Sequence, residues 1–114
     1  MTRSATGDPD VFDDPERGRY EIDADGRTAG FASYVLVPGR VVVTHTEIDP
    51  SEGGHGLGSR LARAILDDIA RRGLRVTPVC PFIADYIRRH PDYLDLVDDR
   101  HRAQLRATAE RETE

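Results

Sequence analysis

The apolar residues of this chain recur with two different spacings, and each spacing predicts one type of element. Between residues 19 and 49, β-branched and aromatic residues alternate with polar ones in "RYEID", "TAGFASYVLV" and "RVVVTHTEID". A period of two is typical of β-strands. Turn signals at Asp25-Gly26 and Pro38-Gly39 separate these segments, so we predict strands joined by tight turns.

A helical spacing follows the strands. Leucine and isoleucine recur every four residues from Leu57 to Ile69, and Gly73 supplies a helix end after two arginines. Residues 74–80 then predict another strand, and residues 81–90 predict a short helix with proline at its first position. A strand, a helix and a strand in this order predict a crossover that makes the last strand parallel to a neighbour. The expected fold class is therefore α/β, with a compact, mixed and mostly antiparallel sheet, one main helix and one or two short helices.

The segments before and after these elements are polar. We therefore predict a single domain with an extension at each end. Residues 1–18 are rich in Asp, Pro and Gly, and Val11 and Phe12 are their large apolar residues, so we expect a loose N-terminal tail. The expected domain comprises residues 19–97. A chain of 114 residues has room for one domain of this size. Residues 98–114 predict a polar helix or tail.

Charge and cysteine content exclude several classes of function. A net charge of -5 disfavours a broad nucleic-acid-binding surface, which needs a basic face. Cys80 is the single cysteine, so an internal disulfide is excluded. The N-terminal segment has no apolar run of signal-peptide or membrane-spanning length. We therefore expect a cytoplasmic protein with no membrane partner, no nucleic-acid partner and no metal.

The main predicted helix is preceded by four glycines in six positions, "GGHGLG" (53–58). The first amides of a helix lack internal partners and carry partial positive charge, and glycines let a phosphate approach them closely. Ser59 could add a hydroxyl donor, and His55 or Arg60 could add charge. The alternative interpretation is a flexible loop before an ordinary helix. The stretch fits neither the P-loop, which needs Lys and then Ser or Thr after its last glycine, nor the GxGxxG dinucleotide motif.

With the strand before it and the helix after it, this stretch resembles the acetyl-CoA-binding motif of the GNAT N-acetyltransferases. That motif consists of Gln or Arg, two variable residues, Gly, one variable residue, and Gly or Ala. Gly56 and Gly58 match its last two fixed positions. Gly53 stands where the family usually has Gln or Arg, so one side chain near the phosphates is missing and we expect weaker phosphate contacts.

Two further stretches sharpen the resemblance. "THTEI" (44–48) and "GLRVTPVCPFIADYIRRHPDY" (73–93) are similar to the small YjdJ-like GNAT-type acetyltransferases, and the similarity covers roughly residues 19–97. Larger GNAT proteins carry N-terminal helices that help to build the acceptor site. Because two expected strands precede "VVVTHTEI" here, the resemblance implies that this wall is missing or is supplied by another chain.

The resemblance implies acetyl-CoA as co-substrate. Its pantetheine arm would lie between the strand before the glycines and the last strand, where backbone amides near Glu47 and Ile48 could stabilise the oxyanion formed on attack. Arg88 and Arg89 could meet the adenosine phosphates or belong to a solvated helix face. The residues expected to bind acetyl-CoA are Thr46, Ile48, Gly53, Gly54, His55, Gly56, Leu57, Gly58, Ser59, Cys80, Arg88 and Arg89.

Acetyl transfer to an amine requires removal of a proton from nitrogen and protonation of the departing thiolate. Glu47 and His45, on one face of the strand, are the candidate bases, and the alternative is a solvated strand face. Tyr86 lies where GNAT enzymes often place a tyrosine that donates a proton to the CoA sulfur, and the alternative is a core ring. Cys80 precedes a helix start, which can lower a thiol pKa, so it is a candidate acetyl carrier or an inert buried residue.

These observations predict an enzyme that transfers an acetyl group from acetyl-CoA to an amine, with Glu47, Cys80 and Tyr86 as the candidate catalytic residues. The acceptor, a small molecule or a protein, and the oligomeric state stay open. Two alternatives from other classes are a non-catalytic acyl-CoA-binding module and an interaction protein that retains the fold.

Overall fold

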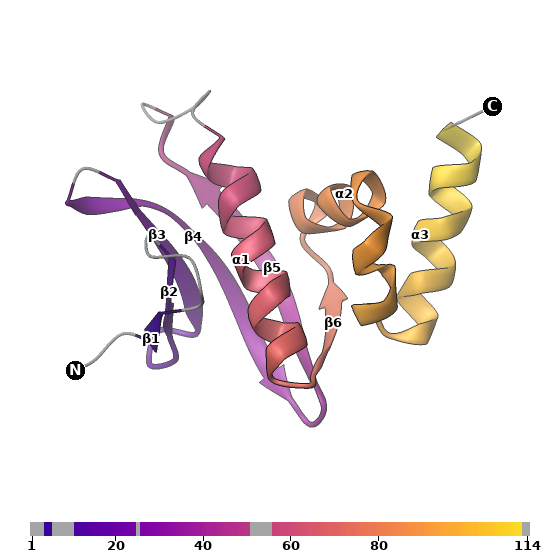
Figure 1. The fold of residues 1–114 in the computed structure, drawn as a ribbon, viewed down its shortest axis with the longest axis horizontal. Helices are drawn as coiled ribbons and strands as arrows, with labels where there is room; N and C mark the ends of the chain where they lie inside the picture. Colours follow the sequence, from indigo (N-terminus) through magenta and orange to yellow (C-terminus); the bar gives the residue numbers. More distant parts are fainter. Residues whose placement is uncertain (1–3, 6–10, 25, 51–55, 113–114) are drawn as a thin grey trace.

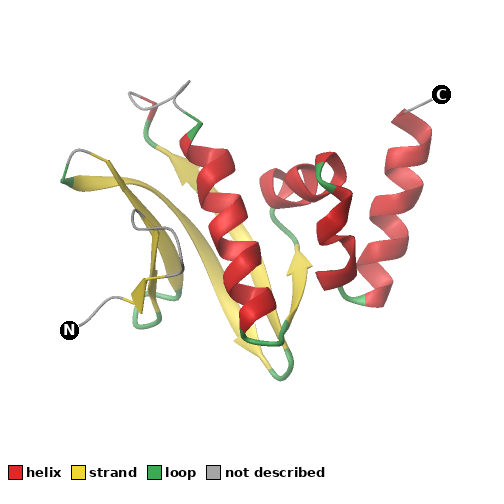
Figure 2. Cartoon of the chain, viewed as in Figure 1, coloured by secondary structure: helices red, strands yellow, loops and turns green. Residues whose placement is uncertain are grey.

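The structure is a computed structural model, and it describes residues 4–5, 11–24, 26–50 and 56–112 (Figures 1 and 2). In these parts of the chain one sheet contains six strands, which lie side by side in chain order. The strands are β1 (Ser4–Ala5), β2 (Val11–Asp14), β3 (Arg19–Ala24), β4 (Arg27–Val37), β5 (Arg40–Ile48) and β6 (Arg75–Pro78). The helices are α1 (Leu57–Arg71), α2 (Pro81–Arg89), the 3-10 helix η2 (Pro91–Leu96) and α3 (Asp99–Glu112).

The strand pairing confirms the expected mixed, mostly antiparallel sheet. Strands β1 to β5 pair antiparallel with their neighbours, whereas β5 and β6 pair parallel. The β4–β5 turn contains Gly39 with φ 79°, a value that glycine adopts without steric cost. The parallel pair is possible because α1 carries the chain back across the sheet between β5 and β6, as the strand, helix, strand order predicted.

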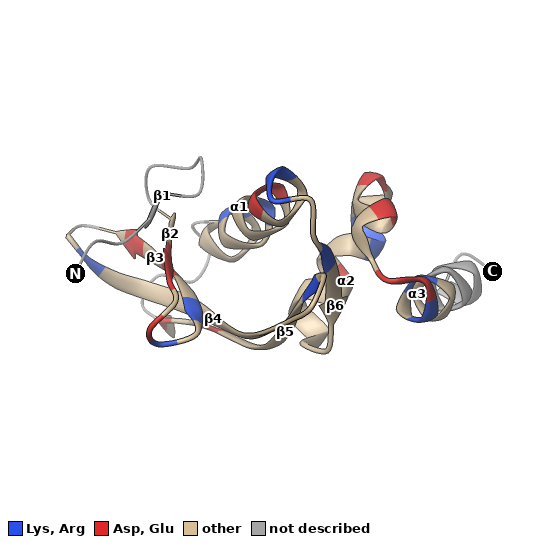
Figure 3. Ribbon diagram, turned by 90° about the horizontal axis from the view of Figure 1, so that it is seen from below, with Lys and Arg blue, Asp and Glu red and all other residues tan. Residues whose placement is uncertain are grey.

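Helix α1 lies in the concave side of the curved sheet (Figure 3). Its spacing of four puts Leu61, Ile65 and Ile69 on one face, and all three are fully buried. They share one apolar cluster with Ile22 of β3 and Val43 of β5. Removing these side chains from water is the main force that holds α1 on the sheet, at about 1.5–3 kcal/mol for each large aliphatic residue.

The C-terminal helix α3 is attached to β6 through Asp98. The Asp98 carboxylate accepts hydrogen bonds from the Thr77 hydroxyl at 2.5 Å and the His101 backbone N–H at 3.1 Å. Burial alone would raise the pKa of Asp98, but these hydrogen bonds lower it to about 2. Asp98 is therefore charged at neutral pH, and it provides a cap for the first turn of α3.

The structure corrects the expectation of a loose tail over residues 1–18. Residues 11–14 form β2, which pairs with β3 along its whole length. The reason is burial at two positions, since Val11 is fully buried and Asp13 is 1% exposed. Residues 1–3 and 6–10 lie outside the described residues. The division of the chain into a domain of residues 19–97 and a C-terminal extension stays a prediction.

A buried polar network joins three strands to the C-terminal end of α1. Asp13 accepts a hydrogen bond from Tyr34 at 2.6 Å, and its other oxygen lies 2.6 Å from the Arg72 guanidinium. Arg72 also contacts Asp68 at 3.0 Å, and Asp68 accepts a hydrogen bond from Tyr20 at 2.7 Å. Burial, and then the carboxylate to which each hydroxyl donates, raise the pKa of both tyrosines. The carboxylates of Asp13 and Asp68 are removed from water, so they need the Arg72 guanidinium, because an unpaired buried charge is costly.

We expect Arg72→Leu to lower the free energy of unfolding by about 2–3 kcal/mol, less than for a fully buried pair because the Arg72 side chain is 38% exposed. Chemical denaturation measures the change. The matched control is Arg71→Leu, because Arg71 is 51% exposed and contacts Asp68 from the surface of the same helix; its expected cost is about 0–1 kcal/mol. Equal costs for the two variants would contradict the assigned role of Arg72.

Candidate functional site

A β-bulge interrupts β5 at Thr44. Ser33 of β4 pairs with His45, but the next residue, Tyr34, pairs with Val43, so Thr44 has no partner of its own in the ladder. The Thr44 hydroxyl donates a hydrogen bond to the Ser33 carbonyl at 3.2 Å. The prediction of a strict two-residue alternation along this strand is therefore wrong at one residue.

The bulge changes which side chains of β5 face α1. Before the bulge, the buried Val43 faces α1. Past the extra residue, Thr46 and Ile48 take the α1 side, and both are half-buried. His45 and Glu47 consequently lie on the opposite face, where their side chains are 61% and 62% exposed. Without the bulge these two polar side chains would follow Val43 into the core.

Strands β5 and β6 part at the same point. Their parallel pairing ends at Val43 and Pro78, and the last backbone link is the Cys80 N–H donating to the Val43 carbonyl at 2.9 Å. The Asp49 N–H donates to the Ala29 carbonyl of β4. Because N–H groups alternate between the two edges of a strand, the amides of Thr46 and Ile48 point to the other edge, beyond the end of β6.

Cys80 lies in this gap. The thiol donates to the Thr46 hydroxyl at 3.2 Å, and Cys80 is 3% exposed. It is also the N-cap residue of α2, without a side-chain hydrogen bond to the helix. Thr46 and Cys80, both expected to bind acetyl-CoA, are therefore in contact with each other, and the contact leaves the thiol buried.

The N-terminus of α1 faces the open end of β5. Gly56 precedes the first helical residue with φ 71°, and the first turn of α1 has no acidic residue and no side-chain cap. In the described part of the chain no side chain therefore caps its first amides, which are the groups that bind anions at a helix N-terminus. Leu57, which we expected to contact acetyl-CoA, is 7% exposed and belongs to the core. The predictions for Gly53, Gly54 and His55 lie outside the described residues.

Gly58 allows α1 and α2 to approach one another. A Cβ atom at this position would lie 2.7 Å from the Phe82 ring, a distance that Cβ atoms do not adopt. The sequence analysis assigned Gly58 to phosphate binding, and the structure supplies a different reason for a glycine here. By contrast, a Cβ atom on Gly56 would meet no atom within 4 Å, so its positive φ is the constraint at that position.

A cavity of about 260 Å³ lies beside this helix N-terminus. Its lining residues are Gly56, Ser59, Arg60, Arg63 and Tyr86. Two guanidinium groups and the amide end of a helix give it a positive potential, as an anion-binding site requires. Sequence reasoning did not place Arg63 in the site. The helical spacing of the sequence could have indicated this position, because residues 56, 60 and 63 are separated by one helical turn each and so share a face.

Tyr86 of α2 lines the same cavity. Tyr86 is 5% exposed, and its ring stacks on His90 with centroids 4.1 Å apart. Burial raises the pKa of Tyr86, and the nearby Arg63 guanidinium opposes this shift. The hydroxyl therefore stays protonated at neutral pH and can act as a proton donor.

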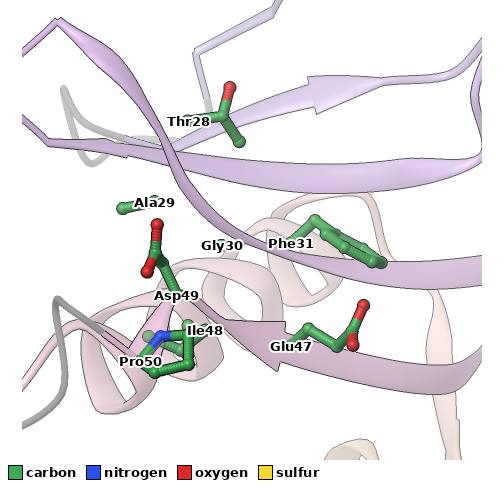
Figure 4. Close-up of a pocket in the computed structure, with 8 residues that line it drawn as sticks. All are labelled: Thr28, Ala29, Gly30, Phe31, Glu47, Ile48, Asp49 and Pro50. Atoms are coloured by element: carbon green, nitrogen blue, oxygen red, sulfur yellow. The ribbon is translucent and has the colours of Figure 1, made fainter.

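A second cavity, of about 280 Å³, lies at the ends of β4 and β5 (Figure 4). It is lined by Thr28, Ala29, Gly30, Phe31, Glu47, Ile48, Asp49 and Pro50. Phe31 and Glu47 extend from neighbouring strands in the same direction, and the Glu47 carboxylate lies 3.6 Å from His45. Asp49 is paired with Arg27 at 3.1 Å. Carboxylates at the mouth of a cavity favour a positively charged ligand.

Arg88 and Arg89 do not line either cavity. Both guanidinium groups contact Asp85 on the same helix, Arg89 at 3.1 Å. These ion pairs are those of the alternative interpretation, a solvated helix face. The assignment of Arg88 and Arg89 to the adenosine phosphates stays a prediction.

No helix among the described residues is long and apolar enough to cross a bilayer. The described residues also contain no group of three or more His, Cys, Asp or Glu residues that could hold a metal ion.

Comparison with known proteins gives a family match over most of the chain. The family described as GCN5-related N-acetyl-transferase matches residues 19–96. The mycothiol acetyltransferase of Clavibacter michiganensis subsp. michiganensis is 46% identical over 76 residues, which are 65% of this chain and 25% of that protein. The mycothiol acetyltransferase of Clavibacter sepedonicus is 39% identical over 75 residues, or 64% of this chain and 25% of that protein. The chain spans about a quarter of the length of these curated relatives.

Among solved structures, the ribosomal-protein-S18-alanine N-acetyltransferase from Escherichia coli superimposes with a TM-score of 0.49 and 19% sequence identity. The superposition covers 62% of this chain and 43% of that chain.

We expect Gly58→Ala to separate α1 from α2 and to lower the melting temperature, because the new methyl group would overlap the Phe82 ring. The double variant Gly58→Ala with Phe82→Leu should recover part of the loss, since the smaller side chain leaves room. Differential scanning calorimetry of the three proteins checks this. If the second substitution only adds to the loss, the contact is not the reason for a glycine at position 58.

Proposed function

The chain belongs to the GCN5-related N-acetyltransferase family, and from this premise we propose that it transfers an acetyl group from acetyl-CoA to an amine. One observation carries the proposal. At a single end of the sheet, a strand with an open edge meets a helix N-terminus and a cavity lined by two arginines. A thioester with an anionic tail needs these elements next to one another.

In this proposal the cavity at α1 binds the pyrophosphate of acetyl-CoA. The backbone at Gly56 lets phosphate oxygens reach the first amides of α1, and the Ser59 hydroxyl can add a donor. Arg60 and Arg63 neutralise the phosphate charge in place of the Gln or Arg that Gly53 replaces. The two arginines therefore offset the weaker phosphate contacts expected at the start of the glycine stretch.

The thioester end is proposed to lie along the open edge of β5. The amides of Thr46 and Ile48 point there, so either can donate to the thioester carbonyl oxygen. Negative charge develops on this oxygen when the amine attacks, and preorganised amide donors stabilise that charge. The end of β6 at Pro78 supports this role, because no described strand pairs with this edge of β5 beyond Val43.

Glu47 is proposed as the base, with His45 beside it. The amine nitrogen attacks the carbonyl carbon, and Glu47 accepts the proton that the nitrogen loses. The second cavity, with the Glu47 carboxylate at its wall, is the proposed acceptor side (Figure 4). An amine that carries positive charge in water is attracted there before it loses its proton.

Tyr86 is proposed to complete the transfer as the acid. When the tetrahedral intermediate collapses, the carbon–sulfur bond breaks and the sulfur takes the electron pair. The Tyr86 hydroxyl then donates a proton to this thiolate, so the products are the amide and neutral CoA thiol. A phenol with a raised pKa holds its proton until the thiolate forms.

Transfer is proposed to be direct, without an acetylated Cys80. Cys80 is buried, and its proton is directed to the Thr46 hydroxyl rather than to a base. A nucleophilic thiol must be accessible to the thioester, and burial opposes this. The proposed role of Cys80 is to fill the gap between β5 and β6 beside the pantetheine arm.

One observation favours a second function, non-catalytic binding of an acyl-CoA. His45 and Glu47 are 61% and 62% exposed. No described element covers them, so the acceptor side lacks a wall in this part of the chain. Under this alternative acetyl-CoA binds but no amine is acetylated.

We expect Glu47→Gln to lower kcat for amine acetylation by about 100-fold, the usual cost of losing a general base, while KM for acetyl-CoA stays unchanged. Free thiol released from acetyl-CoA, measured across a panel of primary amines, gives both constants. The carboxamide keeps the size of the side chain and removes its capacity to accept the proton.

Cys80→Ser is the matched control for the same assay. Direct transfer predicts that this variant retains most of its turnover and that intact-protein mass spectrometry detects no acetylated wild-type enzyme. Unchanged kcat in Glu47→Gln would remove Glu47 from the mechanism. Loss of turnover in Cys80→Ser, together with an acetyl adduct on the wild type, would replace direct transfer by an acyl-enzyme.

A further inference from the structure

Among the four tyrosines of the chain, Tyr86 differs from the other three in its hydroxyl. The hydroxyls of Tyr20, Tyr34 and Tyr93 each donate a hydrogen bond to an aspartate. The Tyr86 hydroxyl makes no hydrogen bond to any residue in the described part of the chain, and Tyr86 lines the cavity with the two arginines. The position of the Tyr86 side chain is therefore set by contacts of its ring rather than by a hydrogen bond of its hydroxyl.

Two rings hold the Tyr86 ring in place. His90 stacks on it, with planes 19° apart, and the Tyr93 ring lies 6.0 Å away in a tilted arrangement. Tyr93 belongs to η2, and its hydroxyl donates to the Asp67 carboxylate of α1 at 2.8 Å. Asp67 lies one helical turn after Arg63. Tyr93 therefore links η2 to α1, the helix that carries both arginines of the cavity, and Tyr86 lies beside this link.

We propose that Tyr93 is a positioning residue: its hydrogen bond to Asp67 holds the Tyr86 ring against α1, so that the Tyr86 hydroxyl points into the cavity. The inference rests on the proposed function, in which Tyr86 protonates the CoA thiolate. A ring that is packed against neighbouring rings moves when one of them moves, and proton transfer is sensitive to displacements of about 1 Å.

Asp67 contributes to this arrangement in two separable ways. It accepts the Tyr93 hydrogen bond, and its negative charge raises the pKa of Tyr86. The other groups that face Tyr86 are Arg63 of α1 and Arg89 and His90 of α2, and both arginines lower its pKa. Asp67→Asn keeps a carbonyl oxygen for Tyr93 but removes the charge, whereas Asp67→Ala removes both.

The kinetic test compares variants that differ by one function. Tyr93→Phe and Asp67→Ala should lower kcat about tenfold, with KM for acetyl-CoA unchanged, because the acid is displaced while the anion site is intact. Asp67→Asn should keep kcat near that of the wild type at neutral pH. The fall of its kcat at high pH should begin at lower pH, because the charge that raises the Tyr86 pKa is gone. Asp92→Asn, in η2 and exposed, is the control and should change neither constant.

A spectroscopic measurement tests the position of the ring without turnover. In protein labelled with ring-13C tyrosine, Tyr86→Phe identifies the Tyr86 signals. These signals should shift in Tyr93→Phe and Asp67→Ala and stay close to their wild-type positions in Asp67→Asn.

Unshifted Tyr86 signals in Tyr93→Phe would overturn the proposal, as would Asp67→Asn matching Asp67→Ala in kcat. The proposed function fails differently. If Tyr86→Phe itself retains wild-type kcat, or if the wild type acetylates no amine, then Tyr86 is not the acid, and the signals alone decide whether Tyr93 positions its ring.

Discussion

The single unpaired residue Thr44 in β5 determines where the polar side chains and amides of the candidate site lie. A bulge reverses the side-chain alternation beyond it and bends the strand. In this protein the reversal moves Glu47 away from the core and brings Thr46 to the side of α1. The bend accompanies the end of the pairing between β5 and β6, so part of the sheet edge has no strand beside it. The candidate site and the hydrophobic core can therefore both use residues of β5.

Contacts on both sides of β5 maintain this irregularity. On the β4 side, pairing continues to Gly30 and Ile48, where any side chain on Gly30 would overlap Ile48. On the β6 side, the contact from Cys80 to Thr46 spans the gap. Helix α1 is fixed by the polar network at its C-terminal end and by close approach to α2 at its N-terminal end. Its first amides consequently have a defined position relative to the open edge.

Much of the fold follows from the periodicity of the sequence, and the site follows from it less completely. The alternating residues before Ile48 and the spacing of four after Leu57 are local signals, and both elements are present. The position of Gly56 before α1 and the place of Tyr86 on a short helix are also local, and both were predicted. The bulge has no local signal, because "VVVTHTEI" is rich in β-branched strand formers and contains no glycine.

Contacts between distant parts of the chain were missed for a related reason. Asp13 and Arg72 are far apart in sequence, so neither residue indicates that the segment around Asp13 joins the sheet. Gly58 has the appearance of a phosphate-loop glycine, whereas its constraint comes from Phe82 on another helix. Arg63 lines the cavity because it lies on the same face of α1 as Gly56. The helical spacing predicts this shared face, but the cavity that makes the face part of the site is visible only in the structure.

The central claim is that the N-terminus of α1 and the cavity beside it bind the phosphates of acetyl-CoA. Calorimetric titration with acetyl-CoA, with CoA and with pantetheine, which lacks the adenosine and phosphate groups of CoA, tests it most directly. The account predicts saturable binding of acetyl-CoA and CoA with much weaker binding of pantetheine, because the phosphates supply most of the attraction. Absence of heat with acetyl-CoA and an unshifted melting temperature, or pantetheine binding as tightly as CoA, would contradict it.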